Sequence, residues 1–250
     1  MSCLAIDIGN TSTAIGVVRD GRVSGACHLQ GGLLDRTAIE HVVRGLIGHQ
    51  SVDGAALSSV VPSANAVWIS QLRRMMGTTP LLVSARLKLG VRVEYPRPRT
   101  IGADRLANAS AAVGRYGVPA IVADFGTAVT FDVISAQGAY VGGVIAPGLP
   151  LMTRYLAEKT ALLPLVRLRG QCGPIGKSTA GAMRVGAKIG YRGMVREIVA
   201  YLEKGLGLRR PHLLATGGYA HWALDGIGLP FTIDQHLTLY GIGRIFELNN

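Results

Sequence analysis

Two short polar segments, each set between apolar runs, hold the residues whose types and spacing suggest chemistry. In the first, the apolar run Leu4 to Ile8 contains Asp7 and leads into Gly9-Asn10-Thr11 and a second apolar run. Gly9 permits close approach of the backbone to a ligand or a positive φ, and the connection supplies amide, hydroxyl and N–H donors. Donors around one carboxylate suit a phosphate chain with its Mg²⁺, which the carboxylate holds directly or through water.

The second polar segment repeats this layout early in the other half of the chain. Residues Val122 to Ile134 form an apolar run, an Asp-x-Gly step at Asp124, a threonine-rich connection at Thr127 and another apolar run. One such turn could equally be a plain polar hairpin, because short motifs match by chance. Two similar hairpins favour a duplicated domain with a nucleotide between the copies.

The composition is that of a folded α/β chain. Its 250 residues are 48% hydrophobic and 6% aromatic with 34 glycines, which indicates an aliphatic core with many close backbone approaches. No run of about 18 uncharged apolar residues suggests a membrane span, and no basic segment of a secretory signal opens the chain. Cys3, Cys27 and Cys172 are scattered and lack metal-ligand spacing, which predicts reduced thiols in a cytoplasmic protein.

The chain is basic, with 26 Lys and Arg against 15 Asp and Glu and a net charge of +11. Such a surplus fits nucleic acid or anionic small substrates. The basic residues fall in separate groups, such as Arg73-Arg74 and Arg209-Arg210, and no helix-turn-helix, zinc-finger or RNA-recognition signature accompanies them. Solvated faces are therefore favoured over a nucleic-acid surface.

The expected order of elements is that of an RNase H-like half, in which three meandering strands precede alternating helices and strands. Apolar spacing predicts a helix from Asp35 to Ile47, and Ser63 is expected to cap a second helix. We predict a duplicated α/β RNase H-like fold with mixed five-stranded sheets flanked by helices. Its expected domains are residues 1–116 and 117–250.

A basic, proline-containing loop from Arg86 to Gly102 leads into a further candidate site. Asp104 falls at or next to the N-terminus of the following helix, where it could be a plain capping residue. The adjacent Arg105 and Gly102 favour a site instead. A carboxylate at a helix N-terminus beside an arginine should be held in its charged form, as a weak base.

The second half carries several glycine-rich segments. Gly142-Gly143 is expected to break a strand, at a bulge or where the backbone approaches a ligand. The segment Gly170 to Ser178 has one residue too many for a P-loop and no strand before it, so a helix starting at Ser178 or Thr179 is favoured. Gly186, Gly190 and Gly193 share one helix face, which predicts close packing on the sheet or on a second subunit.

Taken together, these segments resemble the type III pantothenate kinase family from the first strand to the last helix. The resemblance rests on Asp7-x-Gly9-Asn10-Thr11, Tyr95 with Gly102-x-Asp104-Arg105, Asp124-x-Gly126-Thr127, Gly142-Gly143-x-Ile145-x-Pro147-Gly148 and Thr216-Gly217-Gly218. It implies an actin-like, sugar-kinase type of duplicated fold and a homodimer. It also implies phosphorylation of pantothenate by ATP, the first step of coenzyme A biosynthesis, with Mg²⁺ and a monovalent cation such as K⁺ or NH₄⁺.

The resemblance also implies roles for individual residues. Asp104 would be the catalytic acceptor of the hydroxyl proton of pantothenate, and Asp124 would ligate the monovalent cation. Asp7 would hold Mg²⁺ through the phosphates. The substrate would be surrounded by Tyr95, Gly102, Ala103, Asp104, Arg105 and Thr179. The ATP phosphates would contact Asp7, Ile8, Gly9, Asn10, Thr11, Ser12, Thr13, Ala14 and Thr127.

Two other functions remain open at this point. One is a regulatory accessory protein of the same fold without kinase turnover, which the loss of Asp7, Asp104 or Asp124 would have favoured; all three are present. The other is an actin-like phosphotransferase or phosphatase with a different substrate.

Overall fold

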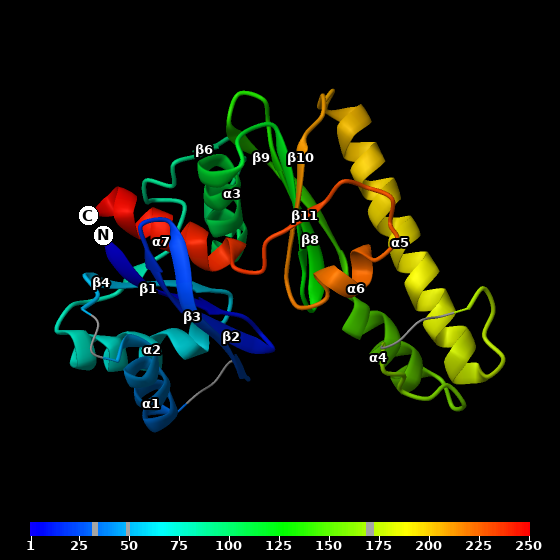
Figure 1. The fold of residues 1–250 in the computed structure, drawn as a ribbon, viewed down its shortest axis with the longest axis horizontal. Coiled ribbons are helices and arrows are strands. Elements are labelled where there is room, and N and C mark those ends of the chain that lie inside the picture. Colours follow the sequence, from blue (N-terminus) through cyan, green and yellow to red (C-terminus); the bar gives the residue numbers. More distant parts are fainter. Residues whose placement is uncertain (32–34, 49–50, 169–172) are drawn as a thin grey trace. The chain divides into compact units, whose positions relative to one another are not determined.

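The computed structural model describes residues 1–31, 35–48, 51–168 and 173–250 (Figure 1). The chain divides into two compact units, each made of more than one segment. The first unit comprises Met1–Ala120, Asp132–Gly142 and His236–Asn250, and the second comprises Ile121–Phe131 and Gly143–Gln235. The domain boundary between residues 116 and 117 stays a prediction.

The first unit is built on a five-stranded mixed sheet in the order β3-β2-β1-β4-β5. Strands β1, β2 and β3 form an antiparallel meander, whereas β4 runs parallel to β1 and β5 runs parallel to β4. This is the strand order predicted for an RNase H-like half. The strands are β1 (Ser2–Ile8), β2 (Ser12–Arg19), β3 (Arg22–Gln30), β4 (Gly54–Ser59) and β5 (Leu81–Leu82).

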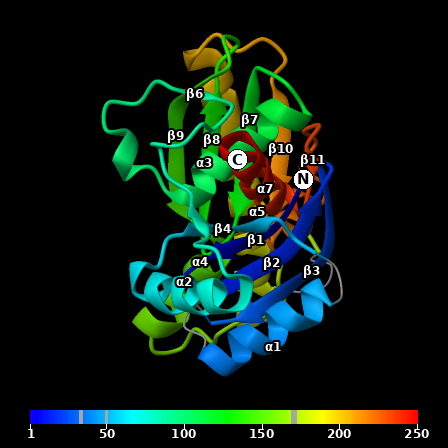
Figure 2. The same ribbon diagram turned by 90° about the vertical axis from the view of Figure 1, so that its left-hand side faces the viewer.

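Large apolar side chains occupy one face of this sheet, because alternate residues of a strand point to opposite faces. Leu4, Ile6 and Ile8 of β1 are fully buried in a core shared with α1 (Arg36–Ile47) and α2 (Pro62–Met76). Figures 1 and 2 show these two helices together on the same side of the strands.

The opposite face of the sheet carries smaller residues, which lets helices approach its backbone closely. On this side lie α3 (Ala103–Arg115) and α7 (Leu237–Asn249), which pack against each other (Figure 2). A Cβ added to Gly16 of β2 would lie 3.2 Å from a methyl group of Leu239 in α7. Asp7 alternates with the large residues of β1, so its side chain belongs to this face.

The start of α2 differs from the prediction. The helix begins at Pro62, and Val61 occupies the cap position, so the assignment of Ser63 as the cap is wrong. Proline suits the first helical position because its missing N–H is not needed there and its fixed φ is already helical. The first helix agrees with its pattern, since Asp35 caps α1 by accepting the N–H of Ala38 at 2.7 Å.

The second sheet has six strands in the order β11-β10-β7-β8-β9-β6, where five were predicted. The added strand β6 (Arg92–Val93) lies within the predicted loop before α3 and pairs parallel with the start of β9. Apart from β6, the order repeats that of the first sheet, as a duplicated fold requires. The other strands are β7 (Ala120–Phe125), β8 (Ala128–Ile134), β9 (Ala139–Pro147), β10 (His212–Thr216) and β11 (Thr232–Ile233).

Strand β9 is continuous through its two glycines, so the predicted break is wrong. Gly142 nevertheless has a φ of +127°, a conformation that L side chains rarely adopt. A Cβ at this position would lie 3.6 Å from the ring of Tyr95, so the glycine also brings the strand close to that ring.

The helices of the second unit are α4 (Leu149–Lys159), α5 (Thr179–Gly205) and α6 (Ala220–Leu224). The long helix α5 packs through Tyr191, whose ring centroid lies 6.2 Å from that of Phe125 in β7. Its glycines at 186, 190 and 193 face open space, because an added Cβ would meet nothing within 4 Å. Within the described residues, the sheet is therefore not the packing partner of this face.

Candidate active site

The connection between β1 and β2 is the tight polar turn predicted from the sequence. Ile8 pairs with Thr13 in the ladder, and the N–H of Gly9 donates to the carbonyl oxygen of Ser12 at 3.0 Å. Gly9 does not have a positive φ. A Cβ there would lie 3.0 Å from the same carbonyl oxygen, so glycine is needed for the tightness of the turn.

The residues of this turn differ in what they can offer a ligand. Asn10 and Thr11 are exposed, so their side chains are accessible to a ligand. Ile8 is fully buried in the core, which leaves only its backbone for contact. Thr13 is also fully buried, and its hydroxyl oxygen has no hydrogen-bond partner among the described residues.

Asp7 is held by a residue that sequence reasoning missed. The hydroxyl of Ser58, in the parallel neighbour β4, donates to Oδ1 of Asp7 at 2.8 Å. Ser58 is itself fully buried. The signal in the sequence is a pair of serines that ends an otherwise apolar strand, where parallel strands present their carboxyl ends to a site.

The end of β4 also leads to the acceptor residues. A Cβ on Gly102, the residue before α3, would lie 3.6 Å from a methyl group of Val60, two residues after Ser58. Ser58 and Val60 therefore connect the carboxylate of Asp7 with the N-terminus of α3 inside the first unit. Two segments assigned to phosphate and to acceptor thus meet at one strand end.

The N-terminus of α3 presents the carboxylate of Asp104. Gly102 is the cap residue, and Oδ1 of Asp104 accepts the backbone N–H of Arg105 at 2.8 Å. A Cβ on Gly102 would lie only 2.4 Å from that oxygen. Position 102 must therefore be glycine for the carboxylate to keep this orientation.

Burial raises the pKa of Asp104 above its ordinary value, and this outweighs the opposing effects of its hydrogen bond and of the charge of Arg105. The expectation that its charged form is stabilised was therefore wrong in direction. The reason is the burial of the carboxylate, which the sequence did not show. The side chain of Arg105 bonds through Nε to Asp132, and only its backbone N–H bonds to Asp104. A raised pKa makes Asp104 a stronger base than an ordinary aspartate.

Arg105 belongs to a buried cluster that also contains Asp132 of β8 and Tyr140 of β9. Nε of Arg105 donates to Oδ1 of Asp132 at 2.7 Å, and the hydroxyl of Tyr140 donates to the same oxygen at 3.0 Å. The ring of Tyr95 packs against that of Tyr140, with centroids 6.2 Å apart. The structure thus joins the predicted substrate residues Tyr95 and Arg105 through two residues that were not predicted.

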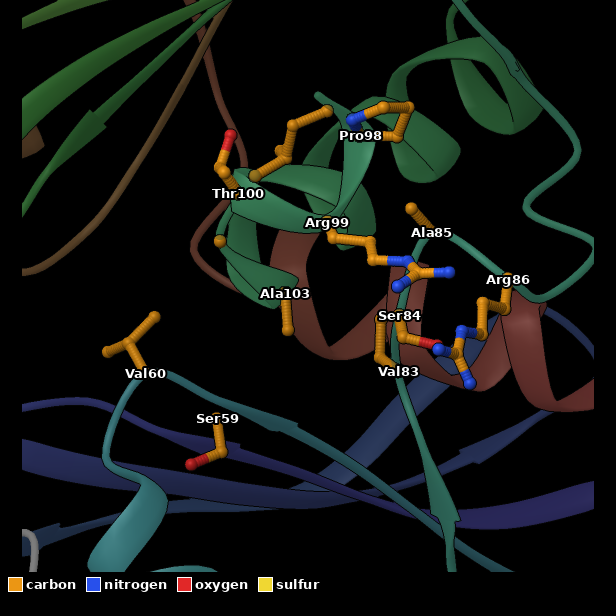
Figure 3. A pocket seen from close by; sticks show the side chains of 12 residues that line it. Ser59, Val60, Val83, Ser84, Ala85, Arg86, Pro98, Arg99, Thr100 and Ala103 are labelled. Atoms are coloured by element: carbon orange, nitrogen blue, oxygen red, sulfur yellow. The ribbon is translucent and has the colours of Figure 1, made fainter. Parts of the chain in front are cut away.

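A pocket of about 260 Å³ opens beside the N-terminus of α3. Figure 3 shows the guanidinium groups of Arg86 and Arg99 pointing to the same side of it, near Ser84. Gly102 and Ala103 form part of its wall, so the pocket adjoins the acceptor residues. The remaining wall consists of Ser59, Val60, Val83, Ala85, Pro98, Thr100 and Ile101.

In the second unit, the connection between β7 and β8 is approached by backbone from two sides. A Cβ on Gly217, which has a φ of +91°, would lie 2.6 Å from Oδ1 of Asp124. A Cβ on Gly148 would lie 2.2 Å from the carbonyl oxygen of Thr127. These two glycines, which the sequence analysis quoted without assigning them a role, enclose the Asp124 segment with main-chain atoms.

Thr179 is the first residue of α5 and is exposed. Ser178 caps the helix, its hydroxyl oxygen accepting the N–H of Gly181 at 3.1 Å, as predicted for a helix start at this point. The hydroxyl of Thr179 is therefore not used in capping. The earlier part of the rejected P-loop, including Cys172, lies outside the described residues.

No group of three or more His, Cys, Asp or Glu residues in the described ranges could hold a metal ion. The cation sites assigned to Asp7 and Asp124 would therefore each use one carboxylate with other oxygen donors. Substrate phosphates or backbone carbonyls are suitable donors of that kind.

Comparison with known proteins identifies relatives along most of the chain. The family model described as type III pantothenate kinase matches residues 3–201. A type III pantothenate kinase from Methylacidiphilum infernorum is 39% identical over 250 residues, covering 98% of this chain and 88% of the relative. One from Akkermansia muciniphila is 47% identical over 197 residues, covering 79% of each chain.

Solved structures with low sequence identity share the fold. A conserved protein of the Baf family of transcriptional activators from Campylobacter jejuni has a TM-score of 0.63 at 16% identity, covering 98% of this chain and 97% of its own. A ROK family glucokinase from Streptomyces griseus, in complex with glucose and AMPPNP, has a TM-score of 0.55 at 16% identity, covering 97% and 98%. The predicted duplicated fold is confirmed by these likenesses to sugar-kinase structures.

Proposed function

This chain belongs to the type III pantothenate kinase family, and from that membership we propose how its residues share the work of the reaction. The protein is an ATP-dependent kinase that phosphorylates pantothenate, the first step of coenzyme A biosynthesis. The observation that carries the residue assignment is the link from Asp7 through Ser58 and Val60 to Gly102. It supports a phosphate site and an acceptor site at one strand end.

Asp104 is the acceptor of the proton from the reacting hydroxyl of pantothenate. Its raised pKa strengthens it as a base, and Gly102 leaves its carboxylate free of a side chain from the residue before the helix. In a loose phosphoryl-transfer transition state the hydroxyl proton leaves late, so the orientation of the nucleophile matters more than base strength. Asp104 therefore acts mainly by holding the hydroxyl in line.

The turn from Asp7 to Ala14 binds the ATP phosphates, and the family resemblance implies the same role for Thr127. The close approach of backbone at Gly9 and the exposed side chains of Asn10 and Thr11 support a ligand with several oxygens at this turn. Asp7 would hold Mg²⁺, which when bound would neutralise phosphate charge. Ser58 keeps the carboxylate of Asp7 oriented toward that task.

Asp124 ligates a monovalent cation, K⁺ or NH₄⁺. Gly217 packs against Asp124, and Gly148 packs against the carbonyl oxygens of Gly126 and Thr127. These contacts support the assignment, because backbone carbonyl oxygens are ligands that K⁺ accepts. The carboxylate would supply the one negative charge of the site. Such a cation would offset the negative charge of a bound phosphate chain.

Pantothenate is surrounded by Tyr95, Gly102, Ala103 and Arg105, and by Thr179 at the start of α5. The pocket beside α3 adjoins Gly102 and Ala103, and its two arginines give it a positive charge suited to an anionic acceptor. Thr179 supports a contact because it is exposed and its hydroxyl is not used in capping.

The protein acts as a homodimer in which α4 and α5 form the contact surface. These helices expose large apolar side chains, among them Tyr155 at 63% and Tyr201 at 73% exposure. The open glycine face of α5 would let a second copy approach its backbone. Sedimentation should give twice the chain mass, and Gly190→Glu should give the chain mass with the melting temperature unchanged.

The regulatory alternative receives no support from the relatives, which are named as kinases at 36–47% identity. The likeness to the Campylobacter jejuni protein concerns the fold alone. Among the described residues, no helix is long and apolar enough to cross a membrane. Cys3 and Cys27 form no disulfide, which supports a cytoplasmic location, where thiols stay reduced.

The experiment is phosphate transfer from ATP to pantothenate, followed by mass spectrometry of the product, in K⁺ and then in Na⁺ buffer. Phosphopantothenate formed with Mg²⁺ and accelerated by K⁺ would agree with the assignment. Glucose and glycerol serve as alternative acceptors. Transfer to one of these but not to pantothenate would overturn the assignment of pantothenate as the substrate. Equal rates in K⁺ and Na⁺ would overturn the assignment of a monovalent cation site.

A further inference from the structure

A fully buried carboxylate lies in the middle of an apolar strand of the second sheet. Asp132 is 0% exposed, with Phe131 and Val133 as equally buried neighbours. A buried charge is costly unless it is paired and hydrogen-bonded, so a carboxylate at this position needs a reason. Its partners show what that reason is.

Both partners of Asp132 bind the same oxygen. Nε of Arg105 donates to Oδ1 at 2.7 Å, and the hydroxyl of Tyr140 donates to it at 3.0 Å. Oδ2 of Asp132 and Nη2 of Arg105 are buried and have no partner among the described residues. The contact is therefore a single bond and not the two-bond fork that arginine usually forms with a carboxylate.

Sharing of Oδ1 fixes the direction in which the arginine points. The guanidinium carbon lies 5.9 Å from the centroid of the Tyr140 ring, and the Arg105 side chain is only 13% exposed. An arginine side chain has many rotamers, and most of them would turn the guanidinium into solvent. Here the hydrogen bond to Asp132 and the ring of Tyr140 keep the guanidinium inside the protein. Arg105 directly follows the catalytic Asp104 in the sequence.

We propose that Asp132 and Tyr140 are positioning residues, which fix the guanidinium of Arg105 so that its remaining N–H groups are preorganised for the acceptor. Preorganised donors raise affinity because the ligand does not have to order them. The identity of the acceptor as pantothenate rests on the function proposed above, whereas the positioning of Arg105 does not.

The same bond protects Asp104. Arg105 follows Asp104 in the helix, and a guanidinium free to turn could pair with that carboxylate and lower its pKa. Asp132 holds Nε of Arg105, and burial raises the pKa of the catalytic carboxylate by more than the charge of Arg105 lowers it. Asp132 thus acts on both substrate binding and the base, in each case through Arg105.

The competing explanation is that Asp132 only fastens α3 to the second sheet. In that case its replacement would lower the melting temperature and affect all kinetic constants alike. A positioning role instead predicts a selective loss of pantothenate affinity. It also predicts that the loss disappears when Arg105 is absent, because residues that act through one another are not additive.

The test compares Asp132→Asn, Tyr140→Phe, Arg105→Ala and the double variant Asp132→Asn with Arg105→Ala. Glu40→Gln is the matched control, since it removes a charge from an ion-paired cluster of Arg44 and Arg74 elsewhere in the first unit. For Asp132→Asn we expect KM for pantothenate to rise about tenfold or more, while KM for ATP changes less than about twofold. Tyr140→Phe should give a smaller rise, and Glu40→Gln none.

The double variant decides between the two explanations. Its KM for pantothenate should equal that of Arg105→Ala alone. A further tenfold rise in the double variant, or an unchanged KM in Asp132→Asn, would overturn the proposal. A drop in melting temperature with equal changes in both KM values would assign Asp132 a structural role only.

A second readout needs no turnover and so separates this proposal from the proposed function. The Nε–H of Arg105 should give a side-chain ¹⁵N signal that exchanges slowly with water in the wild-type protein and rapidly in Asp132→Asn. Slow exchange in both would overturn the positioning role. If wild-type protein failed to phosphorylate pantothenate, the substrate assignment would fall while this comparison still decided the role of Asp132.

Discussion

The guanidinium of Arg105 donates to Asp132, 27 residues away, while its backbone N–H donates to its immediate neighbour Asp104. The two carboxylates therefore accept hydrogen bonds from different parts of one arginine. Asp132 takes a side-chain donor and is fully buried, and Asp104 takes a main-chain donor at the start of a helix. Burial raises the pKa of Asp104 and outweighs the opposing charge of the arginine that follows it.

Gly102→Ala should reduce turnover by about ten- to a hundredfold, because a displacement of about 1 Å in a reacting group has effects of that size. The added Cβ would lie 2.4 Å from Oδ1 of Asp104 and would force the carboxylate to move. Steady-state kinetics would measure the loss. The control is Gly45→Ala in α1, where nothing lies within 4 Å and turnover should be unchanged. Equal turnover in both variants would contradict the role of Gly102.

Ser58→Ala should raise KM for ATP by about ten- to a hundredfold, since a hydrogen bond to a charged group contributes about 1.5–3 kcal/mol. The substitution removes the 2.8 Å bond that orients Asp7. Titration of ATP at saturating pantothenate would measure the change. Ser24→Ala removes a weaker hydroxyl contact of 3.4 Å in the same sheet and should leave KM for ATP unchanged. A change of KM for pantothenate alone would argue against the link to Asp7.

Affinity for pantothenate should fall as the pH drops below about 7. Burial raises the pKa of Asp132 to about 7, against the effects of Arg105 and the Tyr140 hydroxyl and in the same direction as the charge of Asp104. Protonation of Asp132 removes the charge that holds Arg105, so KM for pantothenate rises. Kinetics between pH 5.5 and pH 8 would show this rise in KM at low pH, and Asp132→Asn should lack the rise.

Unfolding would not account for a loss of pantothenate affinity at low pH. The pKa of Asp132 is higher in the native than in the unfolded chain, so this group stabilises the fold below its unfolded pKa of about 3.9. That contribution is lost as the pH rises through about 7. The pH dependence of stability from this group therefore runs opposite to the loss of affinity, and melting temperatures over the same range would separate the two. A loss of pantothenate affinity that followed a fall in melting temperature would contradict the explanation.

Asp124→Asn should abolish the activation by K⁺ and leave a rate close to that of wild-type protein in Na⁺. The substitution removes the charge of the proposed cation site while keeping its size, and Gly217 should still pack against it. Rates measured against K⁺ concentration would give the activation constant. An unchanged response to K⁺ in the variant would place the cation elsewhere.

Much of the fold was predictable because local patterns determined it. The apolar runs on either side of Gly9-Asn10-Thr11 and the helical spacing from Asp35 to Ile47 each indicate one structure, and the structure contains the hairpin of β1 and β2 and the helix α1. Strand β6 was not predictable in the same way. It has two residues in a proline-containing segment, and only its pairing with β9 makes it a strand.

The residues of the candidate site also differ in whether the sequence alone could predict them. Asp7 is visible in the sequence as the one charge in an apolar run before Gly9, and Asp104 is visible between Gly102 and Arg105 at an expected helix start. Asp132 carries the same signal, a lone carboxylate within an apolar strand, but its partner lies 27 residues away in another element. Sequence spacing within a strand or helix cannot show such a pair. It also cannot show the burial that raises the pKa of Asp104, so that direction was predicted wrongly.

Phosphate transfer from ATP to pantothenate by wild-type protein and by Asp104→Asn, measured side by side, tests the central claim most directly. We expect turnover by the wild type and a fall of about a hundredfold or more in the variant, the size typical of a lost general base. ATP affinity, measured by calorimetry, should stay within about twofold, because the turn proposed to bind ATP lies between β1 and β2. Undiminished turnover in folded Asp104→Asn would contradict the account.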